Sequence, residues 1–196
     1  MTASAQESLV KQDVPLGLYL MLGYGGSGKS YFARQFAAHT GAVRLNGDAT
    51  RLALFQSRER MKTFGPTEVT EGILDGAMNY ATEQILLAEV SVVYDMTVNK
   101  RHTRKNLGEL AARHGALTTV VWVRTPREIA IQRGQDREDL PDQRRLDKAA
   151  IIDVIEGHIY NMEEPEAHER VVELDGLLPF ADQLTSFTAQ MKDLAL

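Results

Sequence analysis

Cysteine is missing from all 196 residues of the sequence. Its absence excludes disulfide bonds, thiolate metal sites and a cysteine nucleophile, and it suits a reducing cytosol. No apolar run approaches the length needed to span a membrane, and residues 1–13 lack the apolar segment of a signal peptide. We therefore expect a cytoplasmic protein with no membrane partner.

Positive charge is also in short supply. The chain has 22 Lys and Arg against 27 Asp and Glu, which gives a net charge of −5. An acidic chain is a poor non-specific binder of nucleic acid, although a locally basic cleft can still hold one strand end. The length fits a single α/β domain. We expect residues 1–14 to form a flexible tail and residues 15–196 to form that domain.

A glycine-rich segment follows the first apolar run, residues 18–22. It reads Gly23-x-x-x-x-Gly28-Lys29-Ser30, which is the pattern of a phosphate-binding loop (P-loop) between a strand and a helix. The glycines let the backbone turn so that its N–H groups surround a phosphate. Lys29 is expected to reach the β- and γ-phosphates, and Ser30 to offer its hydroxyl to Mg²⁺.

Strand-like and helix-like patterns alternate along the rest of the chain, which predicts a parallel sheet with helices on both faces. The predicted strands cover residues 17–22, 42–45, 91–94, 117–123 and 170–174. The predicted helices cover residues 29–39, 49–56, 66–89, 100–114 and 146–162, and a last one starts at residue 180.

Two of these helices carry finer expectations. In the 66–89 helix, we expect the buried stripe to consist of Val69, Ile73, Ala77, Tyr80, Ala81, Ile85 and Ala88. Another helix is expected to start at Thr125-Pro126, with Thr125 as the cap and Glu128 completing a capping box.

Asp48 and Arg51 follow the second predicted strand. A carboxylate there can face the γ-phosphate and take a proton from an attacking hydroxyl, while an arginine one helical turn later clamps the acceptor. The alternative is that Asp48 caps the next helix. The two roles are compatible, because a cap uses only one carboxylate oxygen.

Asp95 ends the third predicted strand. We expect it to hold a magnesium-bound water or to orient polar groups of the cleft, and Thr97 in the same turn to touch substrate. The alternative for Asp95 is a carboxylate that only meets helix N–H groups. Arg101 and Arg104 are expected to lie on a solvated helix face.

Residues 133–147 are rich in charge and poor in apolar side chains, and we expect them to form a mobile lid. Arg133 and Arg137 lie one turn apart at its root, where an arginine can close over a triphosphate and neutralise charge on the transferred group. The predicted nucleotide-binding set is Gly23, Tyr24, Gly25, Gly26, Ser27, Gly28, Lys29, Ser30, Tyr31, Arg133 and Arg137.

Taken together, these motifs resemble the P-loop kinases of the polynucleotide 5′-hydroxyl kinase type and the related zeta-toxin-like kinases. The resemblance covers residues 18–160 and depends most on Asp48-x-x-Arg51. It implies a three-layer P-loop fold with five parallel strands in the order 2-3-1-4-5. It also implies that Asp48 is the general base, that Arg51 grips the acceptor, that Arg137 contacts the donor phosphates and that Arg133 lies near the adenine.

Two features depart from that family. The segment after the third strand reads Asp95-Met96-Thr97-Val98-Asn99, and the residues before Asp48 are not basic. Both bear on the acceptor, so a small molecule and a nucleic-acid 5′ end are both open.

The sequence therefore predicts a kinase that moves the γ-phosphate of ATP to an alcohol. Its catalytic residues would be Lys29, Asp48 and Arg137, with Mg²⁺ held by Ser30 and Asp95, and with Asp48, Arg51, Asp95 and Thr97 facing the substrate. The alternative is a nucleotide-binding switch that hydrolyses ATP slowly and acts through a protein partner. A toxin-like kinase with a protein inhibitor is a third hypothesis.

Overall fold

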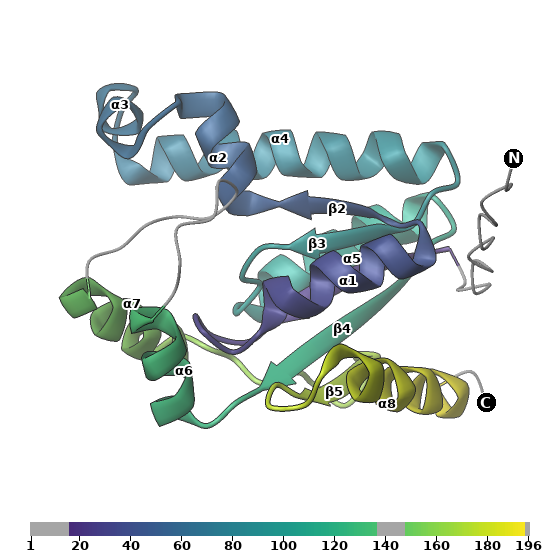
Figure 1. The fold of residues 1–196 in the computed structure, drawn as a ribbon. Coiled ribbons are helices and arrows are strands. Elements are labelled where there is room, and N and C mark those ends of the chain that lie inside the picture. The colour runs from purple at the N-terminus through teal and green to yellow at the C-terminus, as the bar shows by residue number, and fades with distance from the viewer. Residues whose placement is uncertain (1–15, 137–147, 195–196) are drawn as a thin grey trace, which may run out of the picture.

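The computed structural model describes residues 16–136 and 148–194. Its centre is a five-stranded parallel sheet in the order β2-β3-β1-β4-β5 (Figure 1). The strands are β1 (Gly17–Leu22), β2 (Val43–Asn46), β3 (Val92–Asp95), β4 (Leu117–Arg124) and β5 (Val171–Asp175). This order and the predicted P-loop fold are confirmed.

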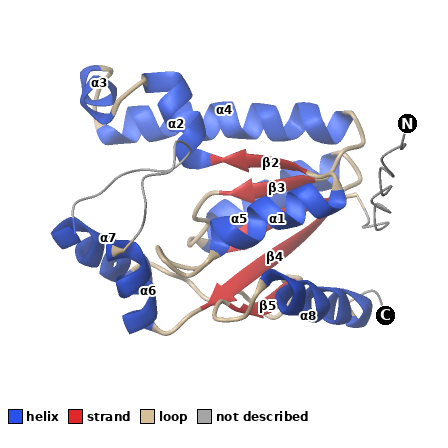
Figure 2. Ribbon diagram, viewed as in Figure 1, coloured by secondary structure: helices blue, strands red, loops and turns tan. Residues whose placement is uncertain are grey.

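Helices follow the strands as the alternating pattern predicts (Figure 2). They are α1 (Lys29–Thr40), α2 (Gly47–Phe55), α3 (Arg58–Thr63), α4 (Thr67–Leu87), α5 (Arg101–Arg113), α6 (Arg127–Gln135), α7 (Lys148–Tyr160) and α8 (Phe180–Asp193). The short helix α3 was not predicted. In the part of the chain that the structure describes, no helix is both long enough and apolar enough to cross a bilayer.

The central strand β1 separates two hydrophobic clusters, because its side chains alternate between the faces of the sheet. Leu18 and Leu20 pack with residues of α4 and α5 on one face. Tyr19 and Met21 pack with residues of α1 and α8 on the other. Both faces of β1 are therefore buried, and the loop that follows it starts from a fully buried strand.

Helix α4 buries a different stripe from the predicted one. Its buried residues are Thr70, Leu74, Met78, Thr82 and Leu86, whereas Val69, Ile73 and Tyr80 are exposed. The prediction was wrong because two threonines occupy core positions. The Thr82 hydroxyl donates to the Met78 carbonyl at 2.8 Å, so burial leaves no unpaired donor.

Residues 133–135 of the predicted lid belong to α6, and residues 137–147, including Arg137, lie outside the described part. The predicted tail, residues 1–14, lies outside it as well. Figure 1 shows α6 and α7 beyond the carboxyl ends of the strands, at the same end of the sheet as the start of α1.

Candidate active site

The loop after β1 turns where three glycines take positive φ angles. They are Gly23 (φ 135°), Gly26 (φ 77°) and Gly28 (φ 102°), and only glycine adopts such angles without strain. Gly25 has no such angle. A glycine at this position is explained by the close approach of α7, since a Cβ there would lie 3.3 Å from Cγ1 of Ile155. The backbone can therefore form an anion nest, closed on one side by α7.

The outer wall of this loop is fixed to the turn between β4 and α6. The hydroxyl of Thr125 is buried and donates to the Ser27 carbonyl at 2.8 Å. The Tyr24 hydroxyl donates to the Thr125 carbonyl, and burial, together with the Glu128 charge, raises the pKa of Tyr24. The predicted capping box is wrong, because Thr125 contacts the loop and Pro126 occupies the cap position of α6 with no side-chain hydrogen bond to the helix.

Lys29 is the first residue of α1, and its side chain folds back over the loop. Its ammonium donates to the carbonyls of Gly23 at 2.7 Å and Tyr24 at 2.8 Å. The side chain is buried, so water screens the charge of the ammonium little, and the charge lies at the nest. This arrangement keeps the ammonium next to the amides that would surround a phosphate.

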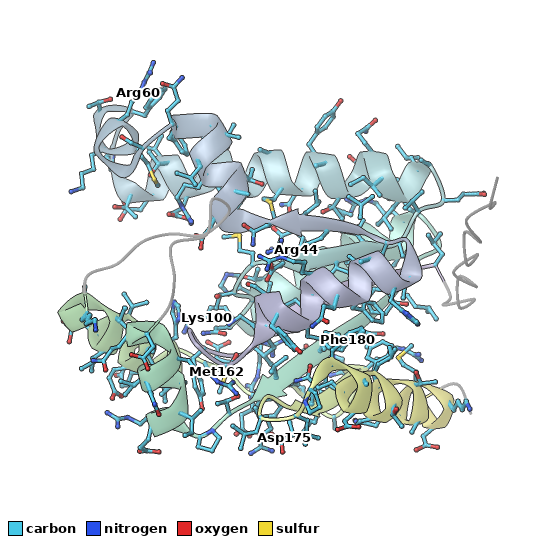
Figure 3. All side chains as sticks on the ribbon, viewed as in Figure 1. Arg44, Arg60, Lys100, Met162, Asp175 and Phe180 are labelled. Atoms are coloured by element: carbon cyan, nitrogen blue, oxygen red, sulfur yellow. The ribbon has the colours of Figure 1, made fainter. Side chains whose placement is uncertain are left out.

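Ser30 and Asp95 form the second polar element. The Ser30 hydroxyl donates to Oδ1 of Asp95 at 3.0 Å, and Asp95 is 4% exposed. Oδ2 accepts from Nε of Arg44 at 2.8 Å and from the Asn46 amide at 2.8 Å. In Figure 3 the Arg44 side chain points inward from β2 toward the start of α1. Asp95 is therefore held by several donors at the carboxyl end of β3.

Asp48 lies in the first turn of α2. The cap of this helix is Asn46, whose side chain accepts from the Ala49 amide at 2.7 Å, so the alternative that Asp48 caps the helix is wrong. Oδ1 of Asp48 accepts from Arg51 at 2.8 Å, and Arg51 also pairs with Glu71 of α4 at 3.1 Å. The result is a chain of charges, acid–base–acid, that fixes the Asp48 carboxyl.

His158 of α7 joins these groups, and the sequence analysis missed it. Its Nδ1 accepts from the Gly25 amide at 3.3 Å. Burial lowers the pKa of His158, the charge of Lys29 lowers it further, and the charge of Asp48 acts in the opposite direction. The imidazole is therefore close enough for the charges of both the ammonium and the carboxylate to shift its pKa. No spacing in the sequence indicated it, because α7 returns to the loop from more than a hundred residues away.

Thr97 lines a cavity of about 480 Å³ between the β3–α5 connection and α7. Its lining mixes polar and apolar surface and consists of Thr97, Asn99, Lys100, Thr103, Val154, Gly157, His158 and Asn161. Since His158 belongs both to this cavity and to the loop contact, the cavity adjoins the anion nest. Its hydroxyls and amides match a small polar molecule.

Two of the basic residues need separate mention. Arg133 donates to the Gly176 carbonyl at 2.8 Å, beside Gly28, so it lies on the β5 side of the loop, and its predicted place near the adenine stays a prediction. Arg104, expected on a solvated face, is buried and forms a two-pronged pair with Glu169, at 2.7 and 3.0 Å. Arg101 is exposed, as expected. Tyr31 is half-exposed on α1, and its predicted contact with nucleotide stays a prediction.

Comparison with known proteins gives a family and a set of similar folds. The sequence profile of an AAA domain family, AAA_33, matches residues 18–158. No curated protein matches the chain in sequence.

Three solved structures share the fold. A sugar kinase from Janibacter sp. HTCC2649, solved without ligand, has a TM-score of 0.66 at 20% identity, over 91% of this chain and 95% of that one. A gluconokinase from Sinorhizobium meliloti 1021 has a TM-score of 0.63 at 21% identity, over 92% and 94%. Kti12 from Chaetomium thermophilum, in complex with ADP-AlF3, has a TM-score of 0.66 at 18% identity, over 89% and 97%.

Proposed function

This chain belongs to the AAA domain family AAA_33, and we propose that it is an ATP-dependent kinase that transfers the γ-phosphate to a hydroxyl group of a small molecule. One observation carries the proposal. A carboxylate, Asp48, is fixed by Arg51 within electrostatic reach of His158, which itself contacts the Gly25 amide of the nest. A loop that only binds nucleotide has no need of a carboxylate fixed beside the histidine that contacts it.

The proposed transfer uses the chain's own groups in a simple order. The loop amides and the Lys29 ammonium bind the triphosphate and balance its charge. The acceptor hydroxyl attacks the γ-phosphorus, its proton passes to the Asp48 carboxylate, and the bond to the β–γ bridging oxygen breaks. ADP leaves with the electron pair of that bond, and the acceptor leaves as its phosphate ester.

Ser30 and Asp95 would hold Mg²⁺. A hydroxyl and a carboxylate oxygen 3.0 Å apart are oxygen donors, the kind that this cation prefers. When bound, Mg²⁺ would neutralise charge on the β- and γ-phosphates. Arg44 and Asn46 orient the Asp95 carboxylate for this role.

The choice of a small acceptor rests on the cavity that contains Thr97. Its volume and the hydroxyl and amide groups of its lining suit a hydroxylated molecule, and two structures of similar fold are a sugar kinase and a gluconokinase. A nucleic-acid 5′ end is the second candidate acceptor, which the net charge of −5 disfavours.

The test is transfer of labelled γ-phosphate from ATP, with Mg²⁺, to a panel of polyols, sugars, sugar acids, nucleosides and a 5′-hydroxyl oligonucleotide. We expect a phosphorylated small molecule, and we expect Asp48→Asn to lower its formation about 100-fold while ATP binding is retained. The control is Asp153→Asn, which changes an exposed aspartate of α7.

Equal transfer by Asp48→Asn would remove Asp48 as the base. Slow release of phosphate with no phosphorylated acceptor would favour the switch, which acts through a partner protein. Labelling of the oligonucleotide alone would overturn the small-molecule acceptor.

A further inference from the structure

The contact between His158 and the loop has a defined chemical direction. The Gly25 N–H donates and Nδ1 of the imidazole accepts, at 3.3 Å. A nitrogen that accepts carries no proton, so the proton of a neutral imidazole sits on Nε2. His158 is therefore a neutral ring whose lone pair faces a backbone amide of the nest.

Nδ1 occupies the kind of position that a phosphate oxygen takes. In a loop of this type the backbone N–H groups bind the phosphate oxygens, and Gly25 is one of the residues of that loop. An arriving oxygen competes with Nδ1 for this amide. A lone pair on Nδ1 would also repel the oxygen, so the ring must turn or gain a proton.

We propose that His158 is a phosphate-sensing residue of the donor site, whose imidazole yields the Gly25 amide to an entering triphosphate and becomes a hydrogen-bond donor to its terminal phosphate. The proposal rests only on nucleotide binding at the loop, which the proposed function includes, and not on transfer to an acceptor. The proton that the ring gains comes from solvent.

The charges around the ring support this change of role. Lys29 of α1 disfavours a second positive charge, and Asp48 of α2 favours it. Across the cavity, Lys100 of α5 is paired with Glu163 at 3.2 Å. The arginines of α6 are engaged elsewhere, Arg127 with Glu156 and Arg133 with Gly176. A triphosphate would bring several negative charges to this place and reverse the balance, which raises the pKa of the ring.

The same residue also belongs to the cavity that we assign to the acceptor. The His158 carbonyl accepts from the Asn99 amide at 3.1 Å, and both residues line that cavity. Because His158 itself lines the cavity, a movement of its ring would change the cavity wall directly. His158 would thus report to the acceptor side whether the donor carries a γ-phosphate.

The experiment is an NMR titration of the imidazole C–H signals between pH 5 and 8, with and without saturating Mg²⁺ and the non-hydrolysable analogue AMPPNP. The chain has five histidines, and the signal that disappears in His158→Asn is that of His158. We expect its pKa to rise by about one pH unit or more when AMPPNP binds. His168, whose side chain is 78% exposed, serves as the internal control, and its signals are expected not to change when AMPPNP binds.

Affinities give a second readout that a purely structural role would not move. We expect His158→Asn to weaken AMPPNP binding about tenfold relative to ADP binding, because only AMPPNP offers a γ-phosphate to the ring. If AMPPNP saturates the protein and the His158 pKa does not rise, or if both nucleotides weaken equally, the proposal is overturned and the proposed kinase stands. If neither nucleotide binds, both fall.

Discussion

At Gly26 the loop passes so close to α6 that no side chain fits. A Cβ at this position would lie 2.1 Å from the Ala130 carbonyl oxygen, and the backbone φ of 77° is unfavourable for other residues. At Gly25 a Cβ would meet side-chain atoms, Cγ1 of Ile155 at 3.3 Å and Nδ1 of His158 at 3.8 Å. Adjacent glycines of one loop thus serve different purposes.

We expect Gly26→Ala to lower the free energy of unfolding by at least about 1–2 kcal/mol, because the left-handed backbone alone costs that much and the loop must also shift. Gly25→Ala should cost less, since Ile155 can move by a few tenths of an ångström. Chemical denaturation of the two variants measures the difference. Equal losses would mean that the loop does not have the described backbone.

Some residues of the site can be predicted from sequence motifs and others cannot. Lys29, Ser30 and Asp48 belong to local motifs, because each lies in a short segment that a strand precedes. Arg44 and His158 do not. Arg44 meets Asp95 only because β2 and β3 pair in parallel, with Asn46 opposite Asp95, and that pairing joins residues about fifty positions apart. Spacing along the chain carries no such information.

At the scale of the element, α4 shows how a helix can present two plausible apolar faces. One face contains Leu74, which is fully buried. The neighbouring residue Ile73 lies on the other face and is 43% exposed. Hydrophobicity alone favoured the exposed face. The sheet selects the other one because threonines can bury their methyl groups while their hydroxyls bond to the helix backbone.

We expect Leu74→Ala to destabilise the protein by about 2–5 kcal/mol and Ile73→Ala by clearly less, because only the first substitution leaves a cavity in the core. Thermal or chemical unfolding of both variants tests this. A larger loss for Ile73→Ala would show that the stripe read from the sequence is the buried one after all.

Helix α5 is tied to the segment that follows α7 by a group of ion pairs, which we call the clasp. It joins Lys100 to Glu163, Arg101 to Glu166 and Arg104 to Glu169. The first two pairs are exposed and worth little, whereas the Arg104 pair is buried. Lys100 also lines the cavity, so the clasp ties the α5 side of the cavity to the segment that follows α7.

At the scale of the whole molecule, the clasp makes the free energy of unfolding depend on pH. Burial of Glu169 raises its pKa, but the hydrogen bonds from Arg104 and from the Glu166 amide, with the nearby positive charges, outweigh burial and lower the pKa below the ordinary 4.5. A carboxyl whose pKa is lowered by folding stabilises the protein above its unfolded pKa. That contribution is lost as the pH falls through the folded value.

We expect Glu169→Gln to lower the free energy of unfolding at pH 7 by about 1.5–3 kcal/mol and to flatten its decline below pH 4.5, because the lost bonds go to a charged group. Urea denaturation as a function of pH measures both effects. The matched control is Glu173→Gln, which breaks the exposed pair with Arg124 and should cost well under 1 kcal/mol. An unchanged slope for Glu169→Gln would contradict the role of the clasp.

The fold as a whole could be predicted because its information is local. Each strand ends in glycine or in polar residues, and the helices between the strands, except α3, could be located from the sequence. Family resemblance then supplied the strand order. What could not be predicted depends on packing between distant segments. Thr125 looked like a helix cap, and only the approach of β4 to the loop shows that its hydroxyl binds Ser27 instead.

The pairing of Asp95 with Arg44 has a consequence for the order in which the site would fill. The carboxylate already faces a guanidinium, and among the described residues no three acidic or histidine side chains gather where a metal could bind. A lone divalent cation would thus gain little by entering. Such an ion would enter already bound to the nucleotide, so the protein would bind the metal–nucleotide complex and not the free metal.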